Sequence, residues 1–141
     1  MHRRYADLLR GLPTGSESVR QRQSNPRKVY PIDPSLIDLF DRRGQRQLGQ
    51  RLETVVALEL WRRGCSLSYG LTPEREEVDL VARGPDGSVR LVQVCVDLQD
   101  PATCARELRP LESLVDPPHR RLDRPVGVRL IPAVEWLLEL G

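Results

Sequence analysis

The chain has 141 residues and a mass of 16.1 kDa, enough for one domain with a single modest core. Its net charge of +2 and pI near 8.6 fall short of what a dedicated nucleic-acid-binding protein usually carries. The chain contains neither an apolar run of about 18 residues nor a signal-peptide pattern at its start, so we expect no membrane partner and a cytoplasmic location.

Cysteine and lysine are scarce in this chain. The cysteines Cys65, Cys95 and Cys104 are odd in number and lack C-x-x-C spacing, which predicts neither a disulfide framework nor a zinc site. Among the 22 Lys and Arg residues, Lys28 is the single lysine. Any chemistry that needs an ammonium group therefore has one candidate.

Residues 1–28 differ in composition from the rest of the chain. A short helix is expected over residues 3–10, followed by a stretch rich in Gly, Pro, Ser, Gln and Arg without apolar periodicity. This composition predicts a flexible basic N-terminal tail. Its basic residues could contact phosphates, but a solvated tail is the simpler interpretation; they are Arg20, Arg22, Arg27 and Lys28.

Two helices are expected next along the chain. After an extended segment over residues 28–33, Asp33 stands where an N-cap is needed, with a proline at the first helical position, for a helix that ends near Gly44. The strongest helical signal covers residues 45–63, where apolar side chains recur every three or four positions. Gly64 then has the position of a C-cap.

The remaining pattern alternates between strands and helices. The expected elements are strands over residues 65–69, 77–82 and 89–97, a helix over 100–115, a strand over 126–131 and a helix from 132. The sequence GPDG at residues 84–87 predicts a hairpin between the second and third strands. We therefore expect an α/β domain over residues 29–141, with a mixed central sheet of about four strands flanked by helices.

One group of polar residues stands out within these apolar elements. Glu53 lies on the long helix, Asp79 lies in the middle of a strand, and Gln93 and Cys95 follow on the next strand across the hairpin. A carboxylate buried without a partner costs several kcal/mol. Asp79 is therefore expected to point to water, accept hydrogen bonds or bind a cation.

Five segments of the chain together resemble a known module. They read KVYPIDPSL, GQRLETVVALELWRRG, EVDLVA, LVQVCVDLQDPATCARELRPL and VRLIPAVEWLLE, in this order. The chain resembles the C-terminal domain of unknown function of prokaryotic AAA+ family ATPases over about residues 28–140. That resemblance implies a restriction-endonuclease-like fold of the PD-(D/E)XK type.

The resemblance also implies roles for individual residues. In active nucleases of this fold, a helix Glu, a strand Asp and the E-x-K of the next strand converge, and the carboxylates hold Mg²⁺. Glu53 and Asp79 match the two metal-binding carboxylates, whereas Gln93 and Cys95 stand at the E and K positions. Mg²⁺ is thus the cofactor, and nucleic acid the partner, that the resemblance suggests.

The chain departs from the nuclease pattern at two of these positions. Gln93 is neutral, and Cys95 supplies no permanent positive charge beside a phosphate. Nothing in the sequence places Lys28 at the site. The chain also lacks the GxxxxGK[ST] motif, so the ATP hydrolysis of the family is not expected here, and a AAA+ ATPase or another protein becomes a candidate partner.

We therefore expect a degenerate, non-catalytic nuclease-fold module that binds a protein partner or nucleic acid. The alternative is a weak Mg²⁺- or Mn²⁺-dependent nuclease that uses Glu53 and Asp79, and a third hypothesis is a remnant without activity. Each residue also has an ordinary structural interpretation. Glu53 would pair with Arg46 or Arg63, Asp79 and Gln93 would face outward, and Cys95 would be a small neighbour.

Overall fold

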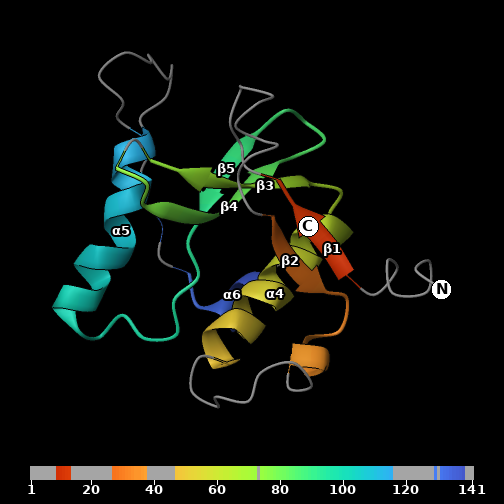
Figure 1. Ribbon diagram of the computed structural model, residues 1–141, viewed down its shortest axis with the longest axis horizontal. Helices are drawn as coiled ribbons and strands as arrows, with labels where there is room; N and C mark the ends of the chain where they lie inside the picture. Colours follow the sequence, from red (N-terminus) through yellow and green to blue (C-terminus); the bar gives the residue numbers. More distant parts are fainter. Residues whose placement is uncertain are drawn as a thin grey trace.

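The computed structural model describes residues 9–13, 27–37, 47–72, 74–115, 129 and 131–138. Its elements are β1 (Leu9–Leu12), β2 (Lys28–Pro31), the 3₁₀ helix η1 (Pro34–Leu36), α4 (Gln47–Arg62), β3 (Ser66–Leu71), β4 (Glu77–Arg83), β5 (Val89–Val92), α5 (Pro101–Val115) and α6 (Ala133–Leu138). They form an α/β structure with two antiparallel sheets, β1–β2 and β3–β4–β5. In Figure 1, α5 lies to the left of the larger sheet and β1–β2 to its right.

Helix α4 ends as its sequence predicts. The Gly64 amide donates to the Trp61 carbonyl and the Cys65 amide donates to the Leu60 carbonyl, each at 3.0 Å, the bond pattern of a Schellman motif. Gly64 has a φ of +80°, a conformation that glycine adopts without steric cost. The predicted C-cap is confirmed.

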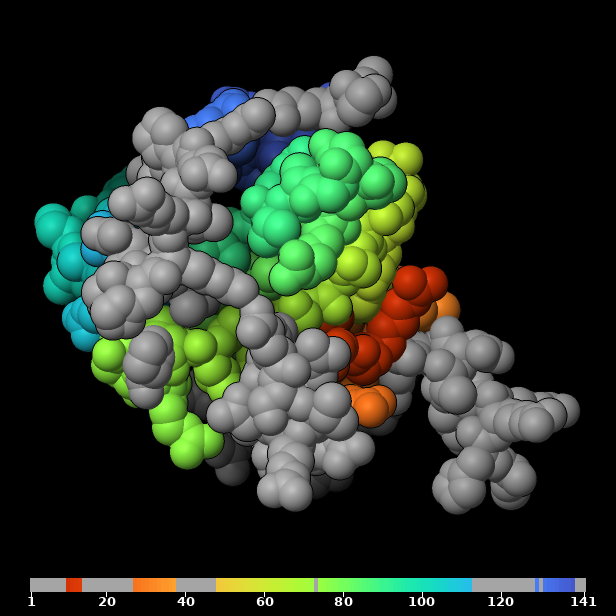
Figure 2. All heavy atoms as spheres, turned by 90° about the horizontal axis from the view of Figure 1, so that it is seen from above, coloured from red at the N-terminus to blue at the C-terminus, as the bar shows by residue number. Residues whose placement is uncertain are grey.

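One hydrophobic core joins α4 to both sheets. Its buried side chains come from β1, β2, α4, β3 and β4; they are Leu12, Tyr30, Val56, Ala57, Leu60, Leu67, Tyr69, Leu80 and Ala82. The two sheets also touch, because the Tyr69 amide donates to the Pro13 carbonyl at 3.1 Å. Figure 2 shows β1, in red, beside the yellow-green surface of β3.

The predicted hairpin between β4 and β5 is confirmed. The two strands pair antiparallel, the Gly84 amide donates to the Ser88 carbonyl at 2.8 Å, and Gly87 takes a φ of +80°. Strand β5 ends at Val92 rather than at residue 97. The reason is that the backbone amides of Asp79 and Val94 donate to side chains and not to the partner strand. The Asp79 amide donates to Gln93, and the Val94 amide donates to Asp79.

Strand β4 contains an irregularity that decides where Asp79 points. Ser68 pairs with Val81 and Gly70 pairs with Val78, so β4 advances three residues where β3 advances two. The additional residue breaks the alternation of side chains, as a β-bulge does. Leu80 can therefore enter the core beside α4. The neighbouring Asp79 reaches the ammonium group of Lys28, which also contacts Glu53 of α4.

Other parts of the fold differ from the expectation or lie outside the described residues. Residues 9–12, expected within a short helix and a flexible tail, form a strand instead, and Lys28 begins the strand with which it pairs. Leu12 gains burial in this strand, where its side chain is only 1% exposed. Residues 126–128 and 130 of the expected fourth strand lie outside the described chain. Within the part described, both sheets are antiparallel, and a mixed sheet is not observed.

Two helices begin at the aspartates that the sequence predicts. Asp33 caps η1 by accepting a hydrogen bond from the Ser35 amide at 2.9 Å, although the rest of the expected helix, residues 38–44, is outside the described chain. Asp100 caps α5 in the same way through the Thr103 amide at 2.9 Å. Among the described residues, no helix is long and apolar enough to cross a membrane.

Candidate functional site

The site is built around the ammonium group of Lys28. Its Nζ atom lies 2.5 Å from Glu77 Oε1, 2.9 Å from Glu53 Oε1 and 3.3 Å from Asp79 Oδ1. The side chains of Lys28, Glu53 and Asp79 are only 20%, 18% and 14% exposed. An ammonium group has three N–H donors, so each donor of Lys28 has a carboxylate oxygen within reach.

Strand β2 supplies two residues to this cluster. Two positions after Lys28, Tyr30 shares the same face of the strand and donates its hydroxyl hydrogen bond to Glu53 Oε1. Burial, and then the charge of Glu53, raise the pKa of Tyr30, so this hydroxyl stays protonated as a donor. The Lys28 ammonium also lies 5.9 Å from the ring centroid of Tyr69 on β3, within cation–π distance.

The protonation of Lys28 is secured by its neighbours. Burial alone would lower the pKa of Lys28, but the hydrogen bond to Glu77 and the charges of Glu53 and Asp79 raise it above its usual value. Lys28 is therefore a fixed cation at neutral pH. It cannot act as a general base there.

Asp79 uses both of its carboxylate oxygens within the protein. Oδ1 faces Lys28 Nζ, and Oδ2 accepts a hydrogen bond from the Val94 amide at 2.9 Å. Burial, and then the charge of Glu53, raise the pKa of Asp79 to about 6, whereas the Val94 amide and Lys28 act in the opposite direction. Asp79 remains largely ionised at pH 7, and it does not face outward.

Gln93 and Cys95 take part in other contacts. Gln93 Oε1 accepts a hydrogen bond from the Asp79 amide at 3.2 Å, and Gln93 Nε2 donates to Glu107 Oε2 of α5 at 3.0 Å. Gln93 thus joins β4 to α5 instead of facing outward. Cys95 donates its thiol hydrogen bond to the Asp97 carbonyl at 3.1 Å. Neither side chain supplies a charge to the cluster.

The structure brings Glu53 and Asp79 to one cation and adds three residues that the sequence reasoning missed. Lys28, Tyr30 and Glu77 complete the cluster. Glu53 pairs with Lys28, whereas Arg63, one of its two alternative partners, pairs with Glu59 at 2.7 Å. Arg46 lies outside the described chain. The signal that could have found Lys28 is its uniqueness in a segment, KVYPIDPSL, that carries part of the resemblance.

The arrangement does not fit the Mg²⁺ that the resemblance implies. Mg²⁺ needs oxygen ligands in a near-octahedral shell, mostly free of other strong partners. Here Glu53 Oε1 accepts from both Tyr30 and Lys28, and both oxygens of Asp79 accept protein hydrogen bonds. Within the residues described, no group of three or more His, Cys, Asp or Glu side chains is arranged to hold a metal ion.

Comparison with known proteins adds no relative. No protein-family model matches the chain, and neither the curated proteins nor the solved structures include a match.

Proposed function

We propose that this chain is a non-catalytic, nuclease-like module that acts by binding a partner rather than by cleaving nucleic acid. The observation that carries the proposal is the position of Lys28, whose ammonium lies between the carboxylates of Glu53 and Asp79. Its three donors are directed to carboxylates, which leaves none for a phosphate or an attacking water.

The charge of the cluster supports a protein partner over nucleic acid at this site. Three carboxylates surround one ammonium, so the cluster repels phosphates unless a further cation is bound.

By the family resemblance, a AAA+ ATPase is the first protein partner to test. Co-expression with such an ATPase, followed by size-exclusion chromatography with light scattering, should give a complex of defined mass. A DNA-binding titration by fluorescence anisotropy provides the comparison. We expect at most weak binding that disappears with added salt, because nonspecific phosphate contacts are screened. Salt-resistant DNA binding would instead favour nucleic acid as the partner.

A second function, weak metal-dependent cleavage, is favoured by one specific observation. Glu53 and Asp79 do lie together, and Lys28 brings a positive charge that Cys95 lacks. If Lys28 leaves the carboxylates when DNA and a metal ion bind, it would stand beside a phosphate. In that case, Gln93→Glu combined with Cys95→Lys should raise the cleavage rate.

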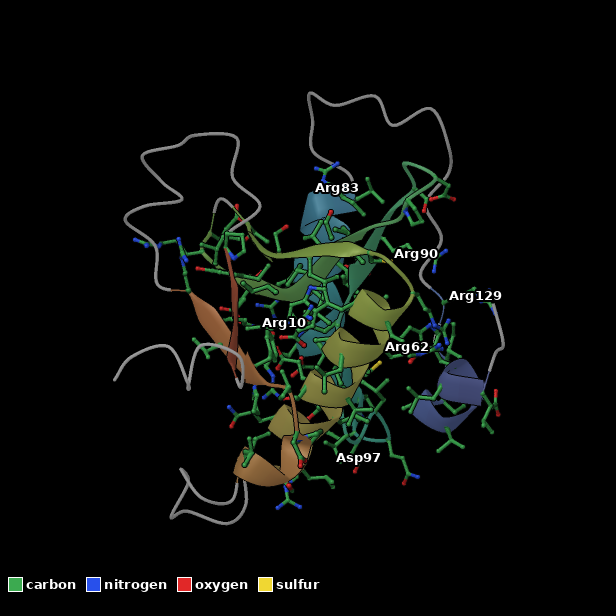
Figure 3. All side chains as sticks on the ribbon, turned by 90° about the vertical axis from the view of Figure 1, so that its right-hand side faces the viewer. Arg10, Arg62, Arg83, Arg90, Asp97 and Arg129 are labelled. Carbon is green, nitrogen blue, oxygen red and sulfur yellow. The ribbon has the colours of Figure 1, made fainter. Side chains whose placement is uncertain are left out.

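An end-labelled DNA cleavage assay with Mg²⁺ or Mn²⁺ separates the two functions. We expect no cleavage by the unchanged chain, by Asp79→Ala or by the matched control Asp97→Ala. Asp97 is an exposed aspartate that Figure 3 shows near the lower end of the molecule, away from β4. Cleavage that Asp79→Ala abolishes and Asp97→Ala preserves would overturn the proposal and establish an enzyme.

A further inference from the structure

We infer that Lys28 is a tethered cation that closes the carboxylate site to divalent metal ions. The inference deepens the proposed function and rests on it for the role of this site. The residue types suggest a metal site, whereas the geometry gives the carboxylates an internal cation instead.

The ammonium occupies the position that a shared metal ion would need. A cation bound by Glu53 and Asp79 together must approach Glu53 Oε1 and Asp79 Oδ1, and Lys28 Nζ lies 2.9 Å and 3.3 Å from these two atoms. Glu77 contributes a third oxygen at 2.5 Å. A metal ion could enter only by displacing Lys28, because two cations a few ångströms apart repel strongly in a partly buried site.

The backbone around Lys28 keeps it in place. Lys28 pairs with Leu12 across the β1–β2 sheet, and Leu12 and Tyr30 are both buried in the core. Tyr30 packs edge to face against Trp61 of α4, with ring centroids 6.0 Å apart, and Arg10 of β1 lies over the same Trp61 ring at 5.1 Å. The β1–β2 sheet that carries Lys28 therefore packs against α4 through contacts with Trp61 that do not involve the ion pairs.

Withdrawal of the ammonium would leave an anionic site in which Tyr30 still donates to Glu53 and the Val94 amide still donates to Asp79. Asp79 stays oriented by the Val94 amide, and Glu53 stays on α4 beside the buried Thr54. Three carboxylates without a counter-ion repel one another, and a divalent cation relieves that repulsion. The inference therefore predicts that loss of the Lys28 charge opens the site to a metal ion.

Isothermal titration with MnCl₂ on the full chain tests this directly. We expect no site-specific binding to the unchanged protein or to Lys28→Arg, which keeps the charge. Lys28→Met should bind one Mn²⁺ at least tenfold more tightly than the unchanged protein, and Lys28→Met with Asp79→Asn should lose that gain. If Lys28→Met does not fold, Lys28→Gln provides a polar replacement of lower volume for the same titration.

Two results would overturn the inference. One is Mn²⁺ binding to the unchanged protein that Asp79→Asn abolishes, and the other is a folded Lys28→Met or Lys28→Gln that gains no binding. A thermal melt with Mn²⁺ or with EDTA gives a second readout, since a ligand that binds only the folded state raises the melting temperature. Metal binding by the unchanged protein without DNA cleavage would refute the inference alone, whereas cleavage that depends on Asp79 would refute the proposed function.

Discussion

The Nζ atom of Lys28 lies 2.9 Å from Oε1 of Glu53, although 25 residues separate the two along the chain. Both side chains are about four-fifths buried, and Tyr30 donates to the same carboxylate oxygen. This pair joins β2 to α4 at the point where the nuclease resemblance expects a metal ion. The charges that stabilise the fold here are therefore the same charges that decide the chemistry of the site.

Removal of the Lys28 charge should destabilise the fold. Lys28→Met leaves the Glu53, Glu77 and Asp79 carboxylates without their cation, and we expect a loss of about 2–4 kcal/mol in the free energy of unfolding. Urea unfolding in EDTA measures this loss without metal binding. Glu53→Gln should lose less when combined with Lys28→Met than alone, with a coupling of about 1–3 kcal/mol. Strict additivity of the two substitutions would contradict a direct interaction.

Asp79 should make stability depend on pH in a particular direction. Its pKa is raised to about 6 in the folded state, mainly by burial, above the ordinary value of 3.8, so the folded protein binds this proton more tightly than the unfolded chain. The stabilisation from this proton is fully present below pH 3.8 and is lost as the pH rises through about 6. The unchanged protein should therefore lose stability relative to Asp79→Asn between pH 4 and pH 7.

The size of this relative change follows from linkage. The rise in the pKa of Asp79 by about two units corresponds to roughly 2–3 kcal/mol of relative stability. Urea unfolding at half-unit pH steps gives the two curves. A constant difference between the unchanged protein and Asp79→Asn over this range would show that Asp79 is not buried with a raised pKa.

Gln93 should resist conversion into the carboxylate of the nuclease pattern. Gln93 Nε2 donates to Glu107 Oε2 at 3.0 Å, so Gln93→Glu would set two carboxylates against each other and remove a hydrogen bond. We expect a loss of about 1–2 kcal/mol in the free energy of unfolding at pH 7. Glu107→Gln in the same chain should restore most of it, because the new amide can donate to the introduced carboxylate. Failure of this rescue would show that Gln93 and Glu107 do not interact.

Two glycines of the α4 region should respond to alanine with opposite signs. Gly64 has a φ of +80° at the helix C-cap, so Gly64→Ala should cost about 1 kcal/mol through backbone strain. Gly49 lies within α4, and an added Cβ would meet only Val96 Cγ2 at 3.7 Å, an ordinary contact. Gly49→Ala should therefore stabilise the chain by about 0.5–1 kcal/mol. Thermal melts of the two variants measure both effects, and equal signs would contradict the expectation.

The elements that the sequence predicted well depend on contacts between near neighbours in the chain. Helix α4 follows from apolar spacing and its end from Gly64, and the β4–β5 hairpin follows from the turn residues at 84–87. The caps of η1 and α5 likewise need only an aspartate two or three residues before the amide it accepts from. Such features depend on residues that lie close together in the chain, so the sequence alone is enough to predict them.

The site residues were only half predictable. The resemblance matches Glu53 and Asp79 to metal-binding carboxylates, and the apolar neighbours of Asp79 leave open whether it points to water, accepts hydrogen bonds or binds a cation. For Lys28 the composition predicts a basic tail, because composition cannot show that a strand forms there. Its contact with Asp79 spans 51 residues and exists only because β1–β2 packs against the core.

By itself, therefore, the sequence determined an α/β chain with one long helix, one tight hairpin and a pair of carboxylates on buried elements. Only the tertiary structure decided that the cation between those carboxylates is Lys28, that the bulge in β4 turns Asp79 toward it, and that β5 ends at Val92. The physical reason is that side-chain periodicity and turn chemistry act locally, whereas the partner of a buried charge is chosen by which distant elements pack together.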